Sequence, residues 1–168
     1  MIAPTTSCTD DAIVAEVLIN APRAAVWAAL TQTRLLESWW GSPDTYRADG
    51  WTIDLRPGGK WESRGTSVDG SKFSVDGEFV DVSPIDRLVM TWKPSWDPTP
   101  PTTIDYRLSE EGKATRLRMT HSGFRGYEQS RDSHSMGWRR VLGWLGEFVE
   151  QNAPHANPPS GQRKVRDA

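Results

Sequence analysis

The sequence predicts an α+β domain in which an antiparallel sheet of seven strands curves around one long C-terminal helix. Two observations support this fold class. Between residues 45 and 122, apolar and polar residues alternate with a period of two, which is typical of strands with one covered face. Near the C-terminus, apolar residues recur at the spacing of an amphipathic helix. The 168 residues, 36% of them hydrophobic, suit one folded domain.

The first expected elements are one strand and two short helices. Residues 12–19 are rich in β-branched side chains and predict the first strand. A helix is expected after Pro22, because proline is favoured in the first helical turn. Thr33 is a candidate cap for the second helix, which places Trp39 and Trp40 near its end.

Six more strands and a long helix follow. Turn signals such as the Asp-Gly pair at 69–70 divide the region 45–122 into short strands. The proline-rich stretch 94–101 predicts a loop. We interpret Trp96 in this loop as a cap packed over the open end of the sheet, with a lid residue as the alternative. The final helix is expected over residues 131–151.

The two ends of the sequence differ from its middle. Residues 152–168 contain three prolines and three basic residues and hardly any large hydrophobic side chain, so they predict a flexible tail. Residues 1–11 have a similar character and are also expected to be a flexible tail. The expected domain therefore covers residues 12–151.

Composition excludes several classes of function. A formal net charge of −2 gives no basic excess for binding nucleic acid. No apolar run approaches the roughly 18 residues of a membrane span, and the N-terminus lacks a signal-peptide core, so a cytoplasmic location is expected. The single cysteine, Cys8, excludes an internal disulfide. His121, His134 and His155 are not expected to bind a metal, because no third ligand accompanies the first two.

The nine tryptophans are the most unusual feature, against three tyrosines and four phenylalanines. In the expected register many of these aromatic side chains point inward, and Tyr106 and His121 add polar groups among them. An aromatic cavity with a few convergent polar groups is typical of a small-ligand site, although plain core packing explains most of these residues individually. The candidate ligand-binding residues are Trp39, Trp40, Trp61, Phe79, Trp92, Tyr106, Met119, His121 and Trp138.

His121 is the candidate with acid–base chemistry near neutral pH. Its strand phase points it inward, and the unperturbed pKa of histidine, about 6.5, would suit a general base. The interpretation that we favour is a neutral structural histidine bonded to the backbone, because burial disfavours the charged form. His134, at the start of the final helix, is expected to be exposed. No catalytic residue is assigned.

Eight short segments, in the same order, resemble one known family. They include residues 39–41 (WWG), 54–61 (DLRPGGKW), 121–124 (HSGF) and 137–138 (GW). These are similar to the SRPBCC superfamily, also called START-like or Bet v 1-like, and within it to the group named for the C-terminal domain of the activator of the heat-shock chaperone ATPase. The resemblance covers about residues 13–150. It implies a helix-grip fold, a ligand cavity between sheet and helix, and no obligatory cofactor.

The resemblance leaves three classes of function open. Binding of a small hydrophobic or aromatic ligand is the prediction. A cyclase- or dehydratase-like enzyme, with Tyr106 and His121 acting on a polyketide-like substrate, is the first alternative. A chaperone-activating interaction module is the second; the true co-chaperones carry a separate N-terminal domain, for which the residues before the first expected strand leave no room. The fold is compatible with a homodimer.

Overall fold

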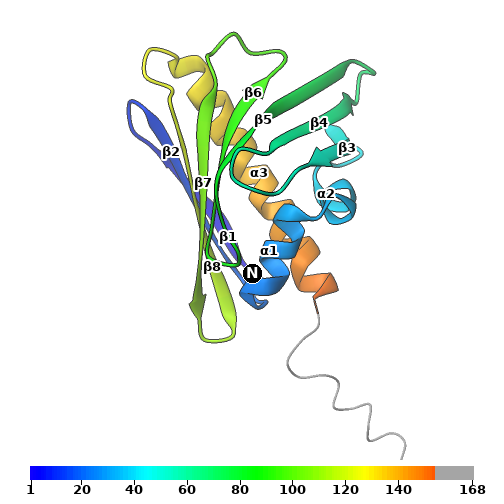
Figure 1. Cartoon of the computed structure of the whole chain (residues 1–168), viewed down its shortest axis with the longest axis vertical. Helices are drawn as coiled ribbons and strands as arrows, with labels where there is room; N and C mark the ends of the chain where they lie inside the picture. The colour runs from blue at the N-terminus through cyan, green and yellow to red at the C-terminus, as the bar shows by residue number, and fades with distance from the viewer. Residues whose placement is uncertain (154–168) are drawn as a thin grey trace, which may run out of the picture.

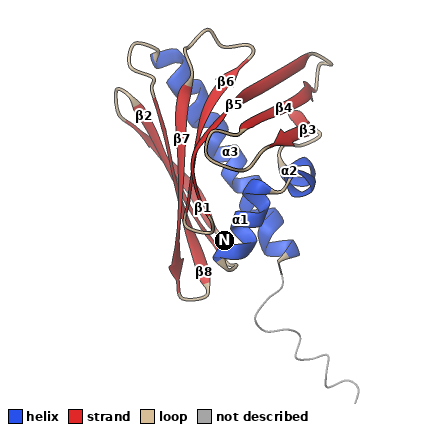
Figure 2. Ribbon diagram, viewed as in Figure 1, coloured by secondary structure: helices blue, strands red, loops and turns tan. Residues whose placement is uncertain are grey.

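An eight-stranded antiparallel sheet wraps around one long helix in the computed structural model, which describes residues 1–153 (Figures 1 and 2). The α+β class is therefore confirmed, and the sheet has one strand more than expected. The strand order across the sheet is β1-β2-β8-β7-β6-β5-β4-β3. The strands are β1 (Ile2–Cys8), β2 (Ala12–Ile19), β3 (Tyr46–Ile53), β4 (Lys60–Ser67), β5 (Lys72–Ser83), β6 (Arg87–Pro94), β7 (Thr102–Glu111) and β8 (Ala114–Ser122). The helices are α1 (Arg23–Thr31), α2 (Thr33–Trp39) and α3 (Glu128–Asn152).

The additional strand is β1, so the expectation of a flexible tail over residues 1–11 was wrong. β1 pairs antiparallel with β2 and forms one edge of the sheet. An edge strand needs only one row of backbone hydrogen bonds and tolerates a proline such as Pro4, so it lacks the apolar alternation of the inner strands. Arg139 of α3 donates to the Thr6 hydroxyl (2.9 Å) and ties the helix to this edge. The tail expected over 152–168 lies outside the described residues, apart from the end of α3 and Ala153.

The inward register of the central strands matches the expected one. In the β7–β8 ladder, Ile104 lies opposite His121 and Tyr106 lies opposite Met119. All four side chains are buried. His121 therefore points into the core, as its phase predicts.

The long helix α3 begins at residue 128, three residues before the expected start, and runs through the curve of the sheet (Figure 1). Its packing against the sheet is concentrated on β1 and β2. The opposite half of the sheet, β3 to β6, curves away from those strands (Figure 1). Aromatic rings from this half pack against one another, such as Trp61 against Trp92. Among the helices of residues 1–153, none is long and apolar enough to cross a bilayer.

Candidate functional site

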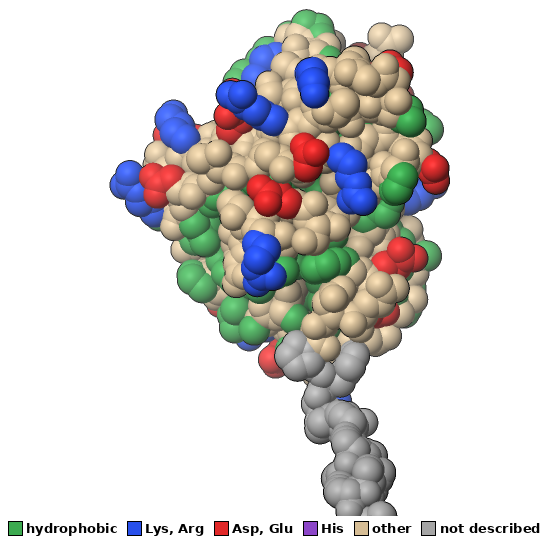
Figure 3. Space-filling view, turned by 90° about the vertical axis from the view of Figure 1, so that its right-hand side faces the viewer, with side chains coloured by type: hydrophobic (Ala, Val, Ile, Leu, Met, Phe, Trp, Pro, Cys, Tyr) green, Lys and Arg blue, Asp and Glu red, His purple; other side chains and the backbone are tan. Residues whose placement is uncertain are grey.

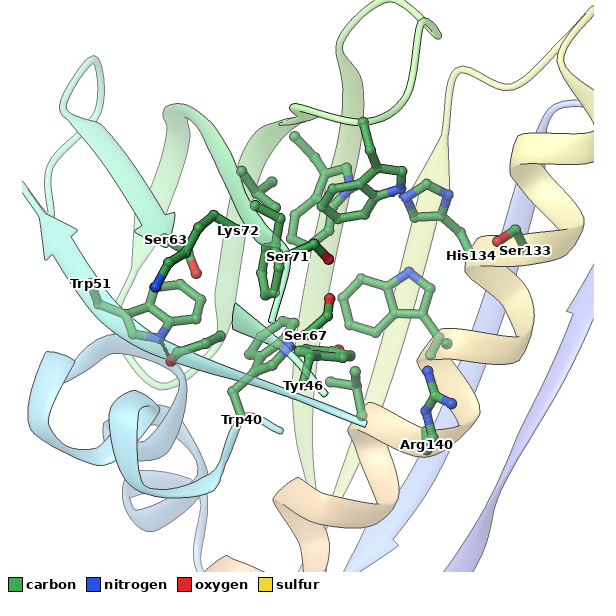
Figure 4. A pocket seen from close by; sticks show the side chains of 18 residues that line it. Trp40, Tyr46, Trp51, Ser63, Ser67, Ser71, Lys72, Ser133, His134 and Arg140 are labelled. Atoms are coloured by element: carbon green, nitrogen blue, oxygen red, sulfur yellow. Dashed lines mark hydrogen bonds between the residues drawn. The ribbon is translucent and has the colours of Figure 1, made fainter. Parts of the chain in front are cut away.

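A cavity of about 420 Å³ lies between α3 and the curved half of the sheet (Figure 4). This volume is in the range of small-molecule sites, about 300–1,000 Å³. Its walls come from the end of α2, from β3 to β6, from the loop after β6 and from one face of α3. Seven of the lining side chains are aromatic: Trp40, Tyr46, Trp51, Phe73, Trp92, Trp96 and Trp138.

Trp40 lies at the centre of a cluster of indole rings. Its ring centroid is 5.0 Å from that of Trp39, 5.3 Å from Trp51, 6.3 Å from Trp92 and 6.2 Å from Trp138. Contacts at these spacings hold aromatic rings in defined orientations. Because these neighbours come from α2, β3, β6 and α3, the cluster joins the helices to the far half of the sheet.

The indole N–H groups of the cluster are already used within the protein. Trp40 Nε1 donates to the Tyr46 hydroxyl (3.2 Å), and Trp51 Nε1 donates to the Ala48 carbonyl (2.7 Å). The indoles of Trp92 and Trp138 donate to histidine nitrogens, as described below. These four tryptophans therefore offer the cavity carbon surface and no free donor.

His121 is a structural histidine whose two ring nitrogens both have partners. Nδ1 accepts from Trp138 Nε1 (2.9 Å), and Nε2 lies 2.7 Å from the Thr102 hydroxyl. Because Nδ1 must accept, Nε2 carries the proton and the ring is neutral. Burial holds the pKa of His121 well below 6.5. The partners are side chains, so the expected bond to the backbone was wrong.

His134 is largely shielded from solvent, so the expectation of an exposed side chain was wrong. Only 11% of its side chain is exposed. Nε2 accepts from Trp92 Nε1 (3.1 Å), and Nδ1 donates to the Ser130 carbonyl (2.9 Å). Burial lowers the pKa of His134 from 6.5, although the Ser130 carbonyl and nearby Asp97 oppose this shift. The low exposure of His134 comes from the loop after β6. Asp97 of this loop accepts a hydrogen bond from the Ser130 hydroxyl and so lies over this part of α3.

Trp96 is exposed at the cavity, which corrects its interpretation as a packed cap. Its exposed fraction is 58%, and its ring meets the Phe73 ring edge-to-face at 5.7 Å. The loop is anchored through the next residue, Asp97, which bonds to Lys93 and Ser130, and the indole is left beside Phe73. Trp96 lines the cavity from the solvent side.

The cavity also has a polar part formed by hydroxyl and basic side chains. Tyr46, Ser63 and Ser67 come from the sheet, Ser71 and Lys72 from the β4–β5 hairpin, and Ser133 and Arg140 from α3 (Figure 4). Figure 4 shows His134, Ser133 and Arg140 on α3, across the cavity from Trp51 and Ser63. No carboxylate lines the cavity among the described residues.

The nine predicted ligand-binding residues divide into three groups. Trp40, Trp92 and Trp138 line the cavity. Trp61, Phe79 and Tyr106 do not line it but border a void of about 10 Å³ behind it, which Trp40 and Trp92 share. Trp61 also borders an open hollow beside Lys60 and Glu78. Trp39, Met119 and His121 are buried and line neither space. Burial raises the pKa of Tyr106 above its usual value of 10.

Sequence reasoning missed several residues that line the cavity. Trp51 has the inward phase of its strand, and this signal could have included it. Tyr46 and Phe73 lie at strand ends, where the alternation is weak. Lys72 and Arg140 are exposed charged side chains, and nothing in a single sequence separates them from ordinary surface residues.

A curved antiparallel sheet that grips a C-terminal helix and leaves an aromatic cavity beside it defines a helix-grip protein of the SRPBCC type. The family model described as Activator of Hsp90 ATPase homolog 1-like protein matches residues 20–150. The chain belongs to this family. Among curated protein sequences, no relative matches.

Solved structures share the fold at low sequence identity. A protein from Nitrosomonas europaea is 22% identical with a TM-score of 0.75, covering 89% of this chain and 100% of its own. CalU16 from Micromonospora echinospora is 23% identical with a TM-score of 0.67, covering 98% of this chain and 92% of its own. DynU16, a protein of the dynemicin biosynthetic locus, is 23% identical with a TM-score of 0.70, covering 84% of this chain and 48% of its own. These likenesses concern the fold alone.

Proposed function

We propose that the protein binds a small hydrophobic or aromatic ligand in the cavity between α3 and β3 to β6. The observation that supports this proposal best is a lining of seven aromatic side chains around about 420 Å³. The indole N–H groups of Trp40, Trp51, Trp92 and Trp138 point to protein partners, so an apolar ring system packed on these four tryptophans leaves none of their donors unsatisfied. Native mass spectrometry of the freshly purified protein, against a denatured control, would detect a retained ligand by its mass.

A catalytic role has less support from the same geometry. A general base must reach the proton that it removes. His121 does not line the cavity, and both of its ring nitrogens are bonded within the protein. Tyr106 borders only the small void, and Trp138 packs against both Tyr106 and His121, with ring centroids at 6.0 and 5.9 Å. We therefore favour binding over the cyclase- or dehydratase-like alternative.

Two glycines of α3 provide a matched test of the site. Gly137 lines the cavity, whereas Gly143 does not. A Cβ built at either position meets no atom within 4 Å. Gly137→Leu should therefore fill part of the cavity and weaken binding of the neutral probe N-phenylnaphthylamine about tenfold or more, since lost stacking and contact area cost over about 1.4 kcal/mol.

The control is Gly143→Leu, which should bind the probe as the unchanged protein does. Both substitutions replace a helical glycine and should stabilise α3 by about 0.5–1 kcal/mol, so lost binding would not reflect unfolding. Probe fluorescence gives the affinity, and thermal unfolding gives the stability. Equal affinity in the two variants would place the ligand outside this cavity.

A further inference from the structure

The charges that line the cavity have one sign. Lys72 and Arg140 are basic, and no acidic side chain lines the cavity among the described residues. The whole chain has 20 Lys and Arg against 22 Asp and Glu. Both signs are interspersed on the face shown in Figure 3. The cavity lining thus carries positive charge in a chain whose net charge is slightly negative.

Neither cation has an ion-pair partner among residues 1–153. Lys72 Nζ donates to the Thr66 hydroxyl (3.2 Å), and the Arg140 guanidinium lies 5.7 Å from the centroid of the Trp144 ring. By contrast, two basic residues of the neighbouring strand β4 form ion pairs: Lys60 with Glu78 (3.6 Å) and Arg64 with Glu62 (3.3 Å). The two cavity cations are thus free to meet an anion from outside the chain.

The other polar groups of the cavity include hydrogen-bond donors. The Tyr46 oxygen accepts from Trp40, so its own O–H can donate, and within the described residues it has no acceptor. Burial raises the pKa of Tyr46, which keeps this O–H protonated, and Arg140 lies close enough to oppose that shift. The hydroxyls of Ser63 and Ser133 also have no hydrogen-bond partner among the described residues. A ligand with an acceptor group satisfies these donors, and an anionic acceptor satisfies the two cations as well.

We infer that the ligand is an amphipathic anion, with a flat aromatic body among the tryptophan rings and one acidic group near Arg140 and Lys72. This inference rests on the proposed function and names the ligand class of the same cavity. The tryptophan faces favour stacking with a flat ring system. The guanidinium and the ammonium favour a carboxylate or sulfonate over a neutral or cationic group.

Two fluorescent probes test the charge separately from the apolar body. Anilinonaphthalene sulfonate and N-phenylnaphthylamine share the same rings and differ in the sulfonate. The unchanged protein should bind the sulfonate about tenfold more tightly, because charge-assisted bonds to two cations at an exposed rim contribute about 0.7 kcal/mol each. Arg140→Gln and Lys72→Gln should each weaken sulfonate binding about threefold and change binding of the neutral probe less than about twofold. Added salt should weaken binding of the sulfonate probe and leave binding of the neutral probe unchanged.

The control variant is Arg139→Gln, which removes the same charge from the next residue of α3. Arg139 bonds to Thr6 on β1 and does not line the cavity, so binding of both probes should be unchanged. Equal affinity for the two probes, or a sulfonate affinity that is the same in all three variants, would overturn the inference and leave the proposed function standing. If neither probe binds, or if Gly137→Leu blocks neither of them, the proposed function falls as well.

Discussion

The Gly77→Ala variant is expected to lose about 3 kcal/mol of its free energy of unfolding. Gly77 of β5 lies opposite Trp61 of β4. A Cβ at this position would overlap the Thr91 carbonyl oxygen and would lie 2.7 Å from Trp61 Nε1. These two atoms form a hydrogen bond of 3.1 Å, so the added methyl group occupies the place of that bond. Backbone cannot move aside cheaply within a paired sheet, which makes the cost large.

Gly50→Ala is the matched control, since Gly50 also lies inside a strand. A Cβ there meets its nearest atom at 3.6 Å, an ordinary contact, so the change in unfolding free energy should be below about 1 kcal/mol. Urea unfolding followed by tryptophan fluorescence measures both variants. Gly77→Ala should also weaken probe binding in the folded protein, because Trp61 packs on Trp51 (6.0 Å) and Trp92 (5.8 Å), which line the cavity. A Gly77→Ala protein as stable as the Gly50→Ala protein would contradict this account.

Gly77 also shows which part of the fold the sequence alone can predict. The alternation of apolar and polar residues predicts the sheet and the inward phase of Trp61, Tyr106 and His121, because each strand residue points to the face opposite its neighbours'. It cannot show that the Trp61 ring crosses a glycine on the next strand. It also cannot show β1, because an edge strand with one bonded side needs no alternation.

The cavity itself was harder to predict than the fold. Periodicity says that a side chain points inward, but the curvature of the sheet decides whether it meets α3 or an empty space. Met119 and Trp92 have the same inward phase, yet Met119 is packed in the core and Trp92 lines the cavity. The burial of His134 depends on the fold of the loop around Asp97, which sequence patterns do not determine. The role proposed for Arg140 can be inferred only once the position of the cavity is known.

Acidification from pH 6.5 to 4.5 is expected to lower the free energy of unfolding by up to about 2 kcal/mol through His121 alone. Burial holds the pKa of His121 in the folded protein well below 6.5, whereas the unfolded chain takes up this proton near pH 6.5. Well above pH 6.5, His121 is neutral in both the folded and the unfolded state and does not lower the free energy of unfolding. Below it, the unfolded state binds more protons, so stability falls by up to about 1.4 kcal/mol per pH unit.

The groups around His121 explain why its neutral form is held so firmly. Trp138 donates to Nδ1, so a proton there would face another donor. The only titratable side chain among the described residues that packs against its ring is His134, with centroids 5.2 Å apart, and a charge on either ring disfavours a charge on the other. Hydrogen bonding outweighs burial and holds the pKa values of Asp97 and Asp105 below 3.8, so these carboxyls protonate below the window from 6.5 to 4.5.

The His121→Gln variant separates this effect from general acid sensitivity. Glutamine can bond to Thr102 but does not titrate. Between pH 6.5 and 4.5, the free energy of unfolding of this variant should therefore change by less than half as much as that of the unchanged protein. The His134→Gln substitution should reduce this loss of stability on acidification less than His121→Gln does, because the Ser130 carbonyl and Asp97 oppose the effect of burial on the pKa of His134. Urea unfolding at a series of pH values gives the slope, which remains informative even if His121→Gln is less stable at every pH. An unchanged slope would show that His121 does not control acid stability.

Since Trp138 both donates to His121 and lines the cavity, a probe that binds there should shift acid unfolding to lower pH.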